Sequence, residues 1–99
     1  VLADLTGEWD NGTLVLMVND AGEYVLNRSG EPGETLMGGF VARDGDQFNF
    51  VTGTTGTCPG QTGVYRATIT AEELSLTLVD DPCPERAAGL EQPLTRMSG

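Results

Sequence analysis

The sequence contains no histidine and no lysine, and its only basic side chains are five arginines. A chain without histidine lacks the most common general base at neutral pH and the commonest metal ligand. It also contains no Gly-x-Ser-x-Gly nucleophile segment and no glycine-rich phosphate loop before a helix. The sequence therefore predicts no catalytic residue, no metal site and no cofactor, and an enzyme is not the favoured interpretation.

Positive charge is scarce while acidic residues are plentiful, and fifteen Asp and Glu residues leave a formal net charge of −10. A phosphate backbone or an anionic membrane surface would be repelled, so nucleic acid is excluded as an expected partner. The longest apolar run, Leu14 to Val18, is far too short to span a bilayer. A small apolar molecule and another protein remain as partner classes, and the composition favours neither a monomer nor a dimer.

The 99 residues are expected to form one domain, residues 1–99. Turn signals recur at short intervals along the chain, at Asn11-Gly12, Asn19 to Gly22, Ser29 to Gly33, Asp44-Gly45 and Cys58 to Gly60. Apolar and polar residues alternate between these turns, which predicts strands near residues 5–9, 13–19, 23–29, 35–43, 46–53, 62–70, 73–79 and 93–97. The pattern is typical of a small all-β protein, here an antiparallel up-and-down barrel of about eight strands.

Two local signals refine this outline. Asp44-Gly45 lies between two apolar runs and predicts a hairpin with a type I′ turn. The segment Pro-Glu-Arg-Ala-Ala, residues 84–88, predicts one short helical turn before the last strand. Pro84 suits the first position of that turn, and Gly89 is expected to end it.

The two cysteines flank a predicted hairpin. Cys58 precedes its first strand and Cys83 follows its second, so antiparallel pairing brings both to the same end of the barrel. We expect a disulfide across 83 − 58 = 25 residues, worth roughly 3–4 kcal/mol of stability in the chain-entropy model. Beside it, Asp80 or Asp81 is expected to cap the helical turn, and Arg86 to pair with a nearby acid.

A disulfide indicates an exported protein, periplasmic or extracellular. The chain opens at Val1 rather than at a methionine, which fits the removal of a leader. The alternative is a cytosolic protein with two buried thiols.

The first and last predicted strands carry a family resemblance. The first begins Leu5-Thr6-Gly7-Glu8-Trp9, and the last contains Arg96 within Pro-Leu-Thr-Arg-Met. A Gly-x-Trp start with an arginine in the last strand resembles the lipocalins and their calycin relatives, and among them the small lipocalin-like barrels of bacterial type. The resemblance implies that Trp9 closes one end of the barrel with Arg96 across its ring, a cation–π pair worth about 0.5–2 kcal/mol.

The chain is much shorter than true lipocalins and has no long helix after the barrel, so its strands and interior should be small. The alternative is that Trp9 is an ordinary core residue of another β fold.

The resemblance and the inward positions together predict the binding of a small, mostly apolar ligand inside the barrel. A few polar groups in an apolar cavity are typical of such sites. Arg28 or a tyrosine would orient a polar end of the ligand. The predicted ligand-binding residues are Tyr24, Leu26, Arg28, Phe40, Phe48, Phe50 and Tyr65.

Two alternatives from other classes remain. One is a secreted protein-interaction domain with a filled barrel, whose contact patch would be Leu90, Leu94 and Met97. The other is a small barrel cyclase or isomerase that acts by shaping its substrate, since proximity alone lowers a barrier without histidine.

Overall fold

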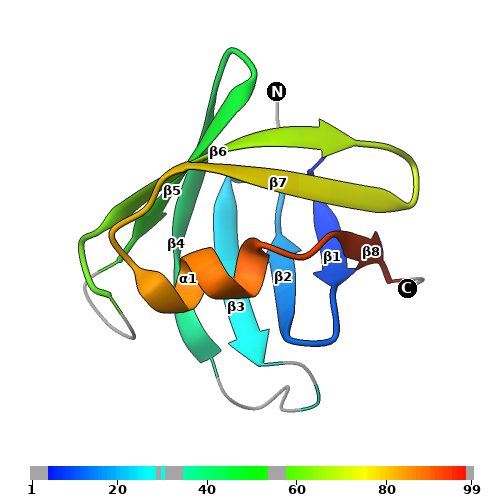
Figure 1. The fold of residues 1–99 in the computed structure, drawn as a ribbon, viewed down its shortest axis with the longest axis horizontal. Coiled ribbons are helices and arrows are strands. Elements are labelled where there is room, and N and C mark those ends of the chain that lie inside the picture. Colours follow the sequence, from blue (N-terminus) through cyan, green and yellow to red (C-terminus); the bar gives the residue numbers. More distant parts are fainter. Residues whose placement is uncertain (1–4, 29, 31–34, 54–57, 98–99) are drawn as a thin grey trace.

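Eight strands close into an antiparallel barrel, in which each strand pairs with its neighbours in sequence and β8 returns to β1 (Figure 1). The structure is a computed structural model that describes residues 5–28, 30, 35–53 and 58–97. The elements are β1 (Gly7–Asp10), β2 (Leu14–Val18), β3 (Glu23–Arg28), β4 (Thr35–Asp44), β5 (Gln47–Thr52), β6 (Thr62–Ile69), β7 (Glu73–Asp80), α1 (Pro84–Leu90) and β8 (Leu94–Arg96). The predicted barrel, with one short helix before the last strand, is confirmed. The turn predicted at residues 29–33 lies, apart from Gly30, outside the described residues.

The strands form because each buries one set of alternating side chains. In β2, for example, Leu14, Leu16 and Val18 are buried while Val15 and Met17 are half-buried on the other face. The inward sets of the strands meet in one core together with residues from α1 and the loops. The buried apolar residues are Leu5, Trp9, Leu14, Leu16, Val18, Tyr24, Leu26, Met37, Val41, Phe48, Phe50, Tyr65, Leu74, Leu76, Cys83, Leu90 and Leu94.

Strand β8 is short, and beyond it α1 lies across a groove from β7. β8 pairs with β7 only at Glu73 and Leu74. The helix can pack closely because Gly89 has no Cβ, which would otherwise collide with Leu14 Cδ1 of β2. The prediction that Gly89 ends the helix is therefore wrong: it lies inside α1, which continues to Leu90.

Two predicted inward residues lie outside the core. Phe40 is 60 % exposed, because the inward positions of β4 are Met37, Gly39 and Val41 and Phe40 falls on the opposite face. Arg28 follows a register shift between Leu26 and Asn27 and is exposed at the end of β3.

The hairpin between β4 and β5 has a different turn from the predicted one. Asp44 pairs with Gln47, so the two central residues are Gly45 and Asp46. Gly45, with φ +64°, is the first of these two central residues. Glycine at the first central position is typical of a type II′ turn, whereas an Asp-Gly type I′ turn has glycine at the second. Nothing in the described part of the chain forms a helix with the length and apolar character of a membrane span.

Candidate functional site

Gly7, Trp9 and Arg96 form a compact unit where β1 meets β8. The Arg96 guanidinium carbon lies 4.1 Å from the centre of the Trp9 ring, and its Nη1 donates to the Thr6 carbonyl at 3.0 Å. Trp9 is fully buried and donates from Nε1 to the Leu5 carbonyl at 2.9 Å. Gly7 has φ +131°, and a Cβ there would lie 2.7 Å from Arg96 Nη1. The glycine thus leaves room for the guanidinium over the indole.

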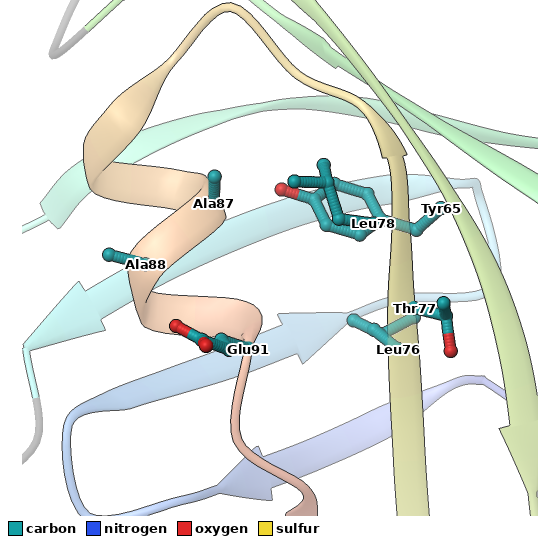
Figure 2. A pocket seen from close by; sticks show the side chains of 7 residues that line it. All are labelled: Tyr65, Leu76, Thr77, Leu78, Ala87, Ala88 and Glu91. Carbon is teal, nitrogen blue, oxygen red and sulfur yellow. The ribbon is translucent and has the colours of Figure 1, made fainter.

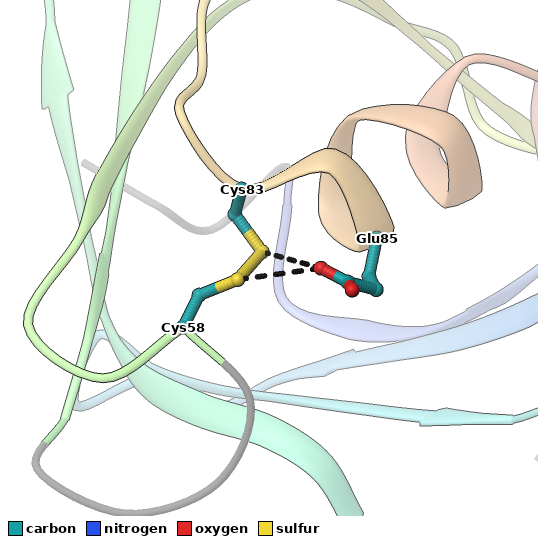
Figure 3. Close-up of side chains that lie close together, drawn as sticks. All are labelled: Cys58, Cys83 and Glu85. Carbon is teal, nitrogen blue, oxygen red and sulfur yellow. Dashed lines mark hydrogen bonds between the residues drawn. A yellow bond between two sulfur atoms is a disulfide. The ribbon is translucent and has the colours of Figure 1, made fainter.

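The predicted disulfide between Cys58 and Cys83 is confirmed, with 5.8 Å between the two Cα atoms. A carboxylate oxygen of Glu85 lies 3.5 and 3.6 Å from the two sulfur atoms (Figure 3). The sulfurs of a disulfide carry no hydrogen, so these contacts are close approaches rather than hydrogen bonds. The same three residues are close enough to hold a metal ion, but oxidation removes the thiolates that such a site requires.

A buried polar cluster fills the barrel beside α1. It consists of Tyr24, Thr52, Tyr65, Asp81 and Arg86. The side chains of Arg86 and Asp81 have no exposed area. Arg86 donates from Nε to one Asp81 oxygen at 2.7 Å and from Nη2 to the other at 2.9 Å. Its Nη1 donates to the Thr52 hydroxyl at 2.7 Å and to the Tyr24 hydroxyl at 3.0 Å.

The Asp81 carboxylate receives further donors. Tyr65 donates from its hydroxyl to Oδ2, and the Cys83 backbone N–H donates to Oδ1 at 2.9 Å. Gly63 makes room for this carboxylate, because a Cβ there would lie 2.5 Å from Oδ2. The pairing of Arg86 with a nearby acid is therefore as predicted, but the acid does not cap α1, whose start has no side-chain cap.

Asp81, Arg86 and Tyr65 each keep one protonation state at neutral pH. Burial would raise the pKa of Asp81, but hydrogen bonds from Arg86 and Tyr65 outweigh it and hold that pKa below its usual value. Burial would lower the pKa of Arg86, and the bonds to Asp81 reverse this into a rise. Burial and the neighbouring Asp81 raise the pKa of Tyr65 far above its ordinary value. The cluster is suited to stabilising the barrel rather than to transferring protons near pH 7.

Aromatic rings pack against this cluster and complete the interior. Phe50 meets Tyr24 edge to face at 5.1 Å between ring centres, and meets Tyr65 in the same way at 5.7 Å. Leu26 and Phe48 are buried in the same core. Five of the seven residues predicted to bind a ligand thus pack against one another or against Arg86.

Sequence reasoning missed Arg86 and Asp81 as interior residues. One signal was present: Tyr24 and Tyr65 were both predicted to line the interior, and buried hydroxyl groups need hydrogen-bond partners. A charged side chain long enough to reach them had to come from an element that covers the barrel, and Arg86 lies on the single predicted helical turn.

A groove of about 460 Å³ runs between α1 and β7. Figure 2 shows Leu76, Leu78 and Tyr65 projecting from the strands toward α1, which contributes Ala87 and Ala88, while Glu91 follows directly after the helix. Tyr65 and Leu76 are buried and form the floor, whereas Leu78 is 51 % exposed. Of the predicted ligand-binding residues, only Tyr65 lines this groove.

The backbone of β7 turns hydrogen-bonding groups toward this groove. The Thr70 N–H donates to the Glu73 carbonyl, so Glu73 and every second residue after it bond toward β6. On the opposite edge the Arg96 N–H donates to the Glu72 carbonyl, so Leu74, Leu76 and Leu78 point their backbone groups toward β8. The pairing of β8 with β7 stops at Leu74. In the described part of the chain, the backbone groups of Leu76 and Leu78 therefore have no strand partner on this edge.

The chain was compared with protein-family models, with curated proteins and with solved structures, and none of them matches.

Proposed function

We propose that this protein is a binding module that takes an extended peptide segment of a protein partner along the open edge of β7. The observation that carries the proposal is the edge at Leu76 and Leu78, which faces a groove walled by α1. An extended peptide placed there would add a strand to the sheet, a common mode of peptide recognition.

The side chains of β7 support strand addition. Proteins usually protect an open strand edge with charged residues, proline or a covering segment. Between Ser75 and Val79 the strand contains neither a charged residue nor a proline, and Leu78 and Val79 are both exposed. An apolar edge of this kind favours pairing with another chain.

Charge indicates the type of peptide. The chain has a net charge of −10, and Glu91 lies at the wall of the groove. A second copy of the protein would carry the same charge and be repelled. The peptide that fits best is therefore basic, with apolar residues at alternate positions that face Leu78 and the Tyr65 floor.

A small, mostly apolar ligand is the second candidate for the same groove. A volume of about 460 Å³ lies in the range of ligand pockets, and the Tyr65 ring and Leu76 give it an apolar floor. The inward positions expected to hold such a ligand are occupied by the aromatic rings and Arg86. The contact patch expected from Leu90, Leu94 and Met97 does not form, because Leu90 and Leu94 are fully buried and only Met97 is exposed.

Two further assignments belong to this proposal. We place the protein in an exported, oxidising compartment, supported by the disulfide between Cys58 and Cys83. We also propose kinship with the lipocalin-like barrels, supported by the Arg96 guanidinium over Trp9 and by the strand order.

The experiment is selection of random peptides from a displayed library against the folded protein, followed by binding to two variants. Leu78→Pro removes the backbone N–H that faces the groove, at an edge position where proline is tolerated. Leu78→Ala is the matched control, because it removes the same side chain and keeps the N–H. Fluorescence of the buried Trp9 checks that both variants fold.

The expected result is a basic peptide whose binding is weakened in Leu78→Ala, which loses an apolar contact, and is abolished in Leu78→Pro, which also loses the backbone donor. Complete loss of binding with both variants would instead indicate that binding depends on the Leu78 side chain and not on the backbone N–H, as the small-ligand candidate requires. Equal binding to the parent and to both variants would overturn the site.

A further inference from the structure

A second groove, of about 340 Å³, lies on the outer face of β1, β2 and β3. Val15 and Met17 of β2 form part of its lining, and both are half-buried although they point away from the core. Apolar side chains on the outer face of a closed barrel have no role in the core. Their position in a concave surface leaves them accessible to the apolar part of a ligand.

The strand register surrounds these apolar residues with polar ones. Val15 pairs with Asp10 on one side and with Asn27 on the other. Met17 pairs with Glu8. Two carboxylates and one carboxamide therefore border an apolar strip two residues long.

Asn27 is the feature that points to a ligand. Its side chain lines the groove and the residue is only 5 % exposed, yet Oδ1 has no hydrogen-bond partner among the described residues. Buried polar atoms in folded proteins are nearly always hydrogen-bonded. The unpaired acceptor calls for a donor that enters the groove from outside.

The charged residues around the groove determine which kind of hydrogen-bond donor is favoured there. Glu8 and Asp10 border the groove, and Arg28 is the cation that lines it. The net charge of −10 adds a field that attracts cations. We propose that this outer groove binds a small amphipathic amine, whose ammonium group donates to Asn27 Oδ1 beside the carboxylates and whose hydrocarbon part covers Val15 and Met17.

This site lies on β1, β2 and β3, whereas the proposed peptide site lies between β7 and α1. The two proposals can therefore be tested independently. The test uses three probes that share one hydrocarbon chain: hexylammonium, 1-hexanol and hexanoate. NMR of the ¹⁵N-labelled protein follows the Asn27 side-chain amide and the backbone amides of Val15 and Met17 during each titration. Saturable shifts at these positions with hexylammonium, and no saturation with hexanoate, are expected.

The variant Asn27→Leu removes the acceptor and keeps the size of the side chain. It should weaken hexylammonium binding at least about ten-fold, since a lost charge-assisted hydrogen bond is worth that much or more. Asn49→Leu is the matched control, because Asn49 alternates with the inward Phe48 and Phe50 of β5 and thus lies on the outer face away from the groove. It should bind like the parent.

Two results would overturn the proposal: equal binding of hexylammonium and hexanoate by the parent protein, or unchanged hexylammonium affinity in a folded Asn27→Leu variant. The probe series on the parent protein decides the question even where the variant does not fold.

Discussion

The guanidinium of Arg86 holds the buried polar cluster together, and the substitution Arg86→Met tests this. Methionine is apolar, unbranched and of similar length, so it fills the space but offers no hydrogen-bond donor. The substitution leaves the Asp81 carboxylate buried without its cation, and the Tyr24 and Thr52 hydroxyls without their shared donor.

The expected cost is large. Removing one partner of a buried ion pair destabilises a protein by about 3–5 kcal/mol, because the remaining charge stays desolvated. A domain of this size has a total stability of about 5–15 kcal/mol. One kcal/mol corresponds to roughly 4–8 °C in melting temperature at this size, so a fall of tens of degrees is expected.

Urea unfolding followed by the fluorescence of the single, fully buried Trp9 measures this cost. The double variant Arg86→Met with Asp81→Leu is the companion experiment. It should regain part of the lost stability, because no uncompensated charge remains in the core. A loss below about 1 kcal/mol for Arg86→Met alone would refute the view that the ion pair organises the interior, since that is the range of exposed pairs.

Three other variants test separate parts of the structure. Replacing Cys58 and Cys83 together by alanine should lower the free energy of unfolding by about 3–4 kcal/mol in urea titrations, and an unchanged midpoint would contradict the disulfide. Gly89→Ala should destabilise by about 1–3 kcal/mol through collision with Leu14, outweighing a gain in helix propensity of about 1 kcal/mol; a more stable variant would contradict the close packing of α1. The raised pKa of Tyr65 gives stability that is fully present below its unfolded pKa, about 10, and is lost as pH rises above it. Tyr65→Phe should therefore lose less stability than the parent between pH 9 and 12, and equal slopes would contradict the buried, neutral hydroxyl.

Alternation predicted most of the barrel because each strand buries one face, so apolar residues at every second position report the pairing directly. The same rule failed in β4. Gly38 and Gly39 have no side chains that show which face is inward, and the large apolar Phe40 was assigned to the core. The structure places Gly39 there instead, paired with Thr52, and Phe40 outside.

The buried polar cluster could not be predicted by the same reasoning, because hydropathy assigns every charged residue to the surface. Arg86 is buried for a reason that involves three elements at once: α1 crosses beside β7, and the hydroxyls of Tyr24 and Thr52 reach it from β3 and β5. The groove between α1 and β7 likewise depends on where β8 ends. A strand was predicted at residues 93–97, but pairing with β7 stops at Leu74, and only the packing of α1 determines what lies beyond.

Amide hydrogen exchange of the free protein, read residue by residue by NMR, tests the central claim that β7 has an open edge beside α1. Ser75 and Thr77 bond toward β6, so their amides should exchange slowly, whereas the amides of Leu76 and Leu78 should exchange fast. A bound basic peptide should then slow exchange at Leu76 and Leu78. Equally slow exchange at all four amides in the free protein would contradict the open edge and with it the proposed binding site.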